Sequence, residues 1–182
     1  KQKLEKLDFT NVTRIYPGID LNKFCPQPKN IQLLKQWKLD ERHFIVSYVG
    51  EYTRLGATNM ITGAFVDFFK KNPKTNLRLV FACRIKNQAD KRKKKEVQMR
   101  FFYSGFLDYV IFTDSITDMS SLYNSSDIII FPVKNLKGKF DVPLVIIESY
   151  ACGKSVILSD LEQFGEFANR DICVSIPKDS EI

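Results

Sequence analysis

The sequence has few of the residues that build metal and disulfide sites. It contains one histidine, His43, and four cysteines in 182 residues. No two of these cysteines form a C-x-x-C pair, so a Cys/His metal centre is not expected. Cysteines within or beside apolar runs behave as small hydrophobic residues, and their use here indicates a reducing compartment. We therefore expect a cytoplasmic protein.

Long hydrophobic runs are also missing. No stretch approaches the roughly 18 to 20 apolar residues of a membrane-spanning helix. Residues 1–8 are charged and carry no apolar core, unlike a signal peptide. Because the chain does not begin with Met, we expect residues 1–182 to be a mature fragment or one domain cut from a longer protein.

Neither of the common glycine-rich phosphate motifs, G-x-G-x-x-G and G-x-x-x-x-G-K-[ST], is present. What the chain does have is a series of short runs rich in Ile, Val and Phe, separated by segments with helical spacing. Such runs are typical of parallel strands that are covered on both faces. They occupy residues 44–49, 77–83, 109–112, 127–131, 155–158 and 172–176.

Four segments between or before these runs are predicted to be helices: residues 31–38, 59–71, 117–124 and 143–152. In the second, we expect one inward stripe made of Met60, Ala64, Phe65, Phe68 and Phe69. In the third, Thr117 is the expected N-cap, with Leu122 and Tyr123 facing inward. The fourth begins at Pro143 and ends before Gly153, the usual order of these residues at helix ends.

The alternation of strands and helices predicts an α/β fold. We expect a doubly wound, three-layer, Rossmann-like domain with a mainly parallel six-stranded sheet. Ligands of such sheets bind at the carboxyl ends of the strands. Those ends are expected at residues 50–56, 83–87, 113–117, 132–141 and 159–164.

The net charge is concentrated in one segment. Residues 86–100 hold seven basic residues and two acidic ones, a net +5 of the chain's +7. This pattern fits the solvated face of a helix, and the segment has few aromatic residues among its charges. The alternative is contact with an anionic surface, either acidic lipid or, less expected, nucleic acid.

Residues 140–160, FDVPLVIIESYACGKSVILSD, carry the most specific pattern. They combine Glu148 with the sequence Ala-Cys-Gly-Lys at 151–154. This stretch resembles the donor-binding segment of group 1 (family 4) glycosyltransferases of the GT-B type, which have two Rossmann-like domains. Three further segments resemble that family in the same order: residues 16–26, 44–56 and 122–132.

The resemblance implies binding of a nucleoside diphosphate sugar. Glu148 would accept hydrogen bonds from the ribose hydroxyls, as a carboxylate can. The alternative is that Glu148 faces solvent or pairs with an internal arginine. Asp141 would contact the donor sugar or, alternatively, cap the following helix. Ile116 is a candidate contact for the base, or it packs under its own loop.

Candidate residues for the diphosphate are Gly50, Arg54, Lys137 and Lys139. For the three basic residues the alternative is ordinary solvated loop charge. The resemblance also shows departures, because the positions where the family commonly has Arg and Lys hold Glu51 and Leu55.

Three other departures concern residues 82–84 and 140–144. Phe140 stands where the family usually has the first of two glutamates, and Pro143 lacks a backbone N–H donor. A glycine-rich turn after the second strand is replaced by Ala-Cys-Arg at residues 82–84.

The resemblance therefore implies the donor-binding half of a hexosyltransferase-type enzyme. We expect its acceptor site in an N-terminal Rossmann-like domain that residues 1–182 lack, and no useful turnover by these residues alone. The family implies transfer without a metal or other cofactor, with retention of configuration. A peripheral position at the cytoplasmic membrane face is a further expectation. The alternatives are a degenerate GT-B homologue without activity, and a module that binds nucleic acid or an anionic surface through the basic segment.

Overall fold

The described sheet contains the six strands that the sequence predicts. The computed structural model describes Leu7, Phe9 and residues 11–13, 15–114, 117–136, 143–168 and 171–177. Within these residues, the six predicted runs form strands whose ends differ from prediction by at most one residue. They are β1 (Phe44–Gly50), β2 (Leu77–Cys83), β3 (Val110–Thr113), β4 (Ile128–Phe131), β5 (Ser155–Ser159) and β6 (Cys173–Ile176).

The described strands all run parallel in the order β3-β2-β1-β4-β5-β6. The chain moves outward from β1 to β3, then returns to place β4 on the other side of β1. The strand order therefore reverses between β1 and β4, and loops from the two halves diverge there. In sheets of this kind, such a switch point is where a crevice for a ligand forms.

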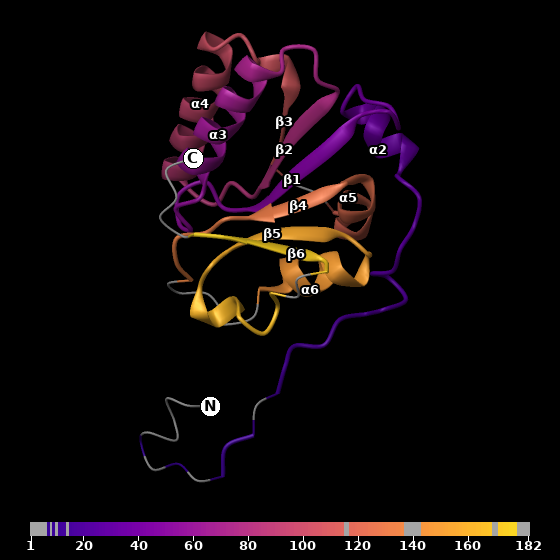
Figure 1. Ribbon diagram of the computed structural model, residues 1–182, viewed down its shortest axis with the longest axis vertical. Helices are drawn as coiled ribbons and strands as arrows, with labels where there is room; N and C mark the ends of the chain where they lie inside the picture. Colours follow the sequence, from indigo (N-terminus) through magenta and orange to yellow (C-terminus); the bar gives the residue numbers. More distant parts are fainter. Residues whose placement is uncertain are drawn as a thin grey trace.

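Helices cover both faces of this sheet (Figure 1). On one face lie α3 (Thr58–Lys71) and α4 (Gln88–Tyr103). On the other lie α2 (Ile31–Gln36), α5 (Met119–Ser125) and α6 (Leu144–Ala151). Two short 3-10 turns, η1 (Leu107–Tyr109) and η2 (Glu162–Phe164), complete the described elements. The three-layer, doubly wound fold predicted from the sequence is confirmed. None of the described helices has the length and apolar character needed to cross a membrane.

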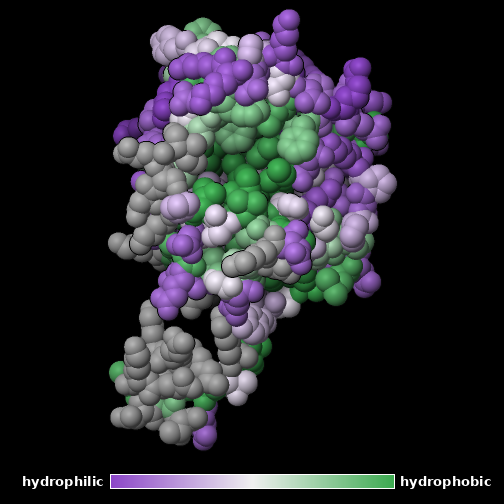
Figure 2. Space-filling view, in the orientation of Figure 1, coloured by the Kyte–Doolittle hydropathy of each residue, from purple (hydrophilic) through white to green (hydrophobic). Residues whose placement is uncertain are grey.

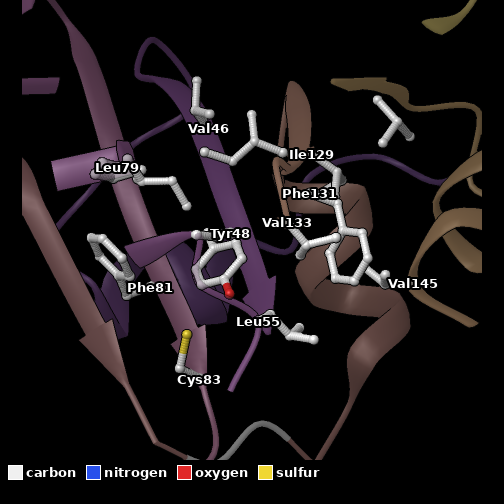
Figure 3. Packing of buried hydrophobic residues seen from close by; sticks show 14 of the residues in the cluster. Val46, Tyr48, Leu55, Leu79, Phe81, Cys83, Ile129, Phe131, Val133 and Val145 are labelled. Carbon is white, nitrogen blue, oxygen red and sulfur yellow. The ribbon is translucent and has the colours of Figure 1, made fainter. Parts of the chain in front are cut away.

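The core consists of two hydrophobic clusters, one on each side of β1. Ile45 packs with Leu34 of α2 and Leu122 of α5. On the opposite face, Val46 and Tyr48 join the main core (Figure 3). Because side chains alternate along a strand, burial on both sides requires an almost continuous apolar run.

Aromatic rings fill the core beneath the carboxyl end of the sheet. The Tyr48 ring meets Phe81 edge-on at 5.9 Å between centroids, and Phe81 stacks on Phe112 at 5.4 Å. Tyr52, from the loop after β1, stacks on the same Phe81 at 6.2 Å. This cluster gives the loop after β1 a rigid base.

The expected inward stripe of α3 is wrong in part. The buried residues of α3 are Thr58, Ile61, Thr62, Val66 and Phe69. Of the predicted stripe, Phe69 is buried, Phe65 packs against the core, and Phe68 is 37% exposed. Counting large apolar residues placed the stripe incorrectly, because two small threonines occupy the side that faces the sheet.

The segment before α2 is anchored along α5. The Phe24 ring lies 6.2 Å from the Tyr123 ring, centroid to centroid. The backbone N–H of Gln27 donates to Asn124 Oδ1 at 2.9 Å, and Asn124 Nδ2 donates to the Cys25 carbonyl at 3.0 Å. Residues 24–27 are therefore held on the same helix that supplies Tyr123.

The N-cap of α5 is Asp118, not the predicted Thr117. The Asp118 carboxylate accepts from the backbone N–H of Ser121 at 3.2 Å and from the Ser121 hydroxyl. Chiefly because of the hydroxyl bond, the pKa of Asp118 is lowered. A carboxylate one residue later in the chain took the capping position because α5 begins at Met119.

We predict that Asp118→Ala lowers the free energy of unfolding by about 1 kcal/mol, the usual cost of losing an N-cap, whereas Thr117→Ala changes it by less than about 0.5 kcal/mol. Since the folded-state pKa is depressed, the contribution of Asp118 is complete above its unfolded-state pKa. It disappears as the pH falls through the folded-state value. Urea unfolding of both variants at neutral and acid pH measures this, and equal losses in the two variants would contradict it.

Candidate functional site

A pocket of about 440 Å³ lies at the carboxyl ends of β1 to β4, at the switch point of the sheet. Strand ends contribute Val49, Gly50, Ala82, Thr113 and Phe131. Helix α6 contributes Leu144, Val145 and Glu148 from the opposite wall. The amino end of α6 therefore faces the pocket, and a helix amino end favours negative charge.

Glu148 lies on the pocket wall and is half-buried. Its Oε2 accepts a hydrogen bond of 2.8 Å from the Tyr123 hydroxyl. Among the described residues, Oε1 has no hydrogen-bond partner. The partner of Glu148 is thus a tyrosine and not the internal arginine that was one alternative. One carboxylate oxygen is held in place while the other is available to a ligand.

Tyr123, which the sequence predicted only to face inward, also lines the pocket. It is buried at the base of the pocket, between Phe24 and Glu148. Burial, together with the charge of Glu148, raises the pKa of Tyr123 above its usual range. The hydroxyl therefore stays protonated and keeps donating to the carboxylate.

Glu51 occupies the position directly after β1 where the resemblance leads one to expect arginine. It is only 5% exposed and lines the pocket. Its Oε1 is 2.6 Å from Lys86 Nζ, and its Oε2 is 3.9 Å from an Arg54 guanidinium nitrogen. A buried carboxylate needs such partners, because burial of an uncompensated charge is costly.

Lys86 and Arg84 bring positive charge into the pocket from the loop after β2. Sequence reasoning noted that this loop lacks a glycine turn, but it missed both residues as candidates. A signal was present, since two basic residues follow a predicted strand end. Their relevance depends on β2 lying beside β1, which places the two loops side by side.

Buried Asp90 connects these two loops. Its Oδ1 accepts from the Thr53 hydroxyl at 2.7 Å, and its Oδ2 accepts from the backbone N–H of Lys86 at 3.1 Å. Asn87 caps α4 by accepting from the Asp90 N–H at 2.9 Å. The backbone that carries Lys86 is thereby held in position.

Of the other predicted site residues, Gly50 and Arg54 lie in the part of the chain that the structure describes. Gly50 lines the pocket. Arg54 is exposed and lies beside Glu51, outside the described pocket lining. The predictions for Asp141, Lys137, Lys139 and Ile116 fall outside the described residues and stay predictions. In the part of the chain that the structure describes, no group of three His, Cys, Asp or Glu side chains is arranged to hold a metal ion.

Comparison with known proteins gives one family. The family model described as "Glycosyl transferases group 1" matches residues 43–181. Among curated proteins, the D-inositol 3-phosphate glycosyltransferase of Salinispora tropica is 27% identical over 158 residues, which cover 82% of this chain and 32% of that protein. The chain thus spans about a third of the length of this relative.

Solved structures share the fold. The C-terminal domain of LpcC, a group 1 family glycosyl transferase from Francisella tularensis, superposes with a TM-score of 0.70 at 21% identity, over 90% of this chain and 82% of that one. HepE of Anabaena, solved in complex with UDP and glucose, gives a TM-score of 0.73 at 18% identity, over 90% of this chain and 43% of that one.

Gly50 has a packing role that is separate from any ligand contact. A Cβ built on Gly50 would lie 2.5 Å from ring and hydroxyl atoms of Tyr48, which is fully buried. The Tyr48 hydroxyl donates to the Glu51 carbonyl at 3.1 Å and so cannot move away without losing that bond.

We predict that Gly50→Ala lowers the free energy of unfolding by about 1 to 3 kcal/mol, the range for overpacked cores. Gly18→Ala is the control, because a Cβ there would meet nothing within 4 Å. Chemical denaturation of the two variants measures the difference. Similar stability of both would show that the ring of Tyr48 yields easily.

Proposed function

The chain belongs to the group 1 glycosyltransferases, and from this membership we propose that it is the donor-binding domain of an enzyme that transfers a glycosyl group from a nucleoside diphosphate sugar. The acceptor-binding residues would lie in a second Rossmann-like domain of the same protein. This division is supported by the coverage of the Salinispora relative, of which the chain spans 32%. In this proposal residues 1–182 bind donor but do not turn it over alone.

The observation that carries the proposal is the arrangement of Glu148. A carboxylate with one oxygen fixed by Tyr123 and the other facing a pocket is suited to accept hydrogen bonds from two adjacent hydroxyls. A ribose presents two such hydroxyls. Because the Tyr123 hydroxyl is buried and stays protonated, the orientation of Glu148 is set before a ligand arrives.

The diphosphate would lie between the amino end of α6 and the loop after β2. Arg84 would supply positive charge together with Lys86, which is paired with Glu51, and the helix end supplies a favourable dipole. Preorganised charge of this kind stabilises a departing nucleoside diphosphate. We propose that these groups take the place of the missing arginine and lysine after β1, and that transfer proceeds without a metal and with retention, as the family implies.

The relatives suggest which ligands to test first. HepE of Anabaena was solved with UDP and glucose, so uridine diphosphate is the first candidate for this pocket. The Salinispora relative is a D-inositol 3-phosphate glycosyltransferase, which makes a polyol phosphate one candidate acceptor for the whole protein.

We predict that one of UDP, GDP and ADP binds the chain saturably in calorimetric titration. Glu148→Gln keeps the shape of the side chain but removes its charge. Affinity should fall roughly 10- to 100-fold, because a hydrogen bond to a charged group contributes about 1.5 to 3 kcal/mol. Glu41→Gln, an exposed site before β1, is the matched control and should bind like the parent.

Two outcomes would contradict this proposal. Equal affinity of the Glu148→Gln variant would remove the ribose role of Glu148. Absence of binding for all three nucleotides, with an unchanged melting temperature, would favour a degenerate homologue that keeps the fold without the donor site.

The role of Lys86 is tested separately, in a variant that lacks the buried carboxylate of Glu51. Glu51→Gln is compared with the double variant Glu51→Gln/Lys86→Met, so that no carboxylate is left unpaired. The loss of Lys86 should lower the affinity for the nucleoside diphosphate about tenfold. The affinity for the corresponding nucleoside should not change, because the nucleoside has no phosphate. An equal effect on both ligands would show that Lys86 only shapes the loop.

A further inference from the structure

The exposed charges of the basic segment lie on one face of α4. Lys93 pairs with Glu96 at 2.7 Å, and Lys94 pairs with Asp114 at 2.6 Å. Lys86 is engaged by Glu51, as described above. Lys91, Arg92, Lys95 and Arg100 are exposed and form no ion pair with any residue that the structure describes. The helix therefore keeps four uncompensated cations on its surface.

Two aromatic residues, Phe102 and Tyr103, follow these cations at the C-terminal end of α4. Residues 92, 95, 99 and 102 follow the three- and four-residue spacing of one helix face. Phe102 is 58% exposed and Tyr103 is 79% exposed, with their ring centroids 5.6 Å apart. Single exposed apolar residues are common, but two adjacent aromatic rings in line with a row of cations form a patch of defined chemistry.

Helix α3 extends the same surface. A shallow groove of about 390 Å³ is shared by Val66 and Lys70 of α3 and by Arg100 and Tyr103 of α4. Asp67 in this groove is an acidic residue, and it pairs with Lys70 at 3.7 Å. Lys71 in the last turn of α3 is also exposed. Figure 2 shows hydrophilic side chains over the upper left of the molecule, where α3 and α4 lie in Figure 1.

We propose that this surface, which we call the α4 face (Lys91, Arg92, Lys95, Arg100, Phe102 and Tyr103), docks the domain on an anionic lipid bilayer. The cations contact lipid phosphates, and the two rings enter the interface between headgroups and acyl chains, where aromatic residues are favoured. Phe102 and Tyr103 lie together at one end of α4 and do not alternate with Lys91, Arg92 and Lys95. Single-stranded nucleic acid is bound by rings that stack successive bases along a charged groove, so this arrangement favours a bilayer. This inference is independent of the donor site.

The test is co-sedimentation of the chain with vesicles of phosphatidylcholine alone and of phosphatidylcholine mixed with phosphatidylserine. We expect binding to the mixed vesicles only, weakened by added salt. Arg92→Glu/Lys95→Glu should reduce it by at least about tenfold. Phe102→Ser/Tyr103→Ser should also weaken it while the dependence on salt remains, because the cations are unchanged.

Lys35→Glu/Lys38→Glu is the matched control. It reverses the same number of charges at exposed positions in and just after α2, which lies on the opposite face of the sheet. This variant should bind vesicles nearly as the parent does. The Arg92→Glu/Lys95→Glu variant should bind nucleotide with the same affinity as the parent. This result would show that the surface acts separately from the donor pocket.

Three results would overturn the proposal. One is equal binding to neutral and anionic vesicles, or to neither. Another is an equal loss in the Lys35/Lys38 and Arg92/Lys95 variants, which would indicate net charge alone. The third is tighter binding to an oligonucleotide than to vesicles, with no effect of the Phe102/Tyr103 change, which would identify nucleic acid as the partner.

Discussion

Strand β1 is buried on both of its faces, and the other elements are arranged to keep it so. Ile45 requires α2 and α5 on one side, whereas Val46 and Tyr48 require the core under α3 on the other. β2 and β4 pair with its two edges. A strand enclosed in this way can present functional groups only where it ends, at Gly50 and Glu51. The position of the pocket is thus a consequence of the burial of β1.

The charges in the pocket depend on the residue at that end. A carboxylate at position 51 is largely withdrawn from water, so it holds Lys86 at 2.6 Å. The same lysine has its backbone N–H bonded to buried Asp90. Two acidic groups therefore hold one basic group in place. The described lining of the pocket combines the basic residues Arg84 and Lys86 with the acidic residues Glu51, Asp114 and Glu148.

The sequence predicts the strands closely because burial on both faces leaves few alternatives to Ile, Val and Phe. A carboxylate inside an apolar helix also has to face something polar, and Glu148 does lie on the pocket wall beside Tyr123, while its role toward a ribose stays a prediction. Lys86 was not predicted as a pocket residue because its position depends on Glu51, which lies 35 residues earlier in the chain. The predicted stripe of α3 was wrong in part because Thr62 faces the sheet. The predicted N-cap of α5 was wrong by one residue, since Asp118 caps the helix in place of Thr117. Such details are decided by packing, which residue type alone does not encode.

The anchoring of residues 24–27 on α5 gives the domain a mechanical link. Tyr123 is at once the ring that Phe24 packs against and the donor that holds Glu148. The chain that leads into the domain and the carboxylate in the pocket therefore share one rigid part. Because Phe24 and Glu148 both contact Tyr123, a displacement of residues 24–27 along α5 would also displace the hydroxyl that donates to Glu148.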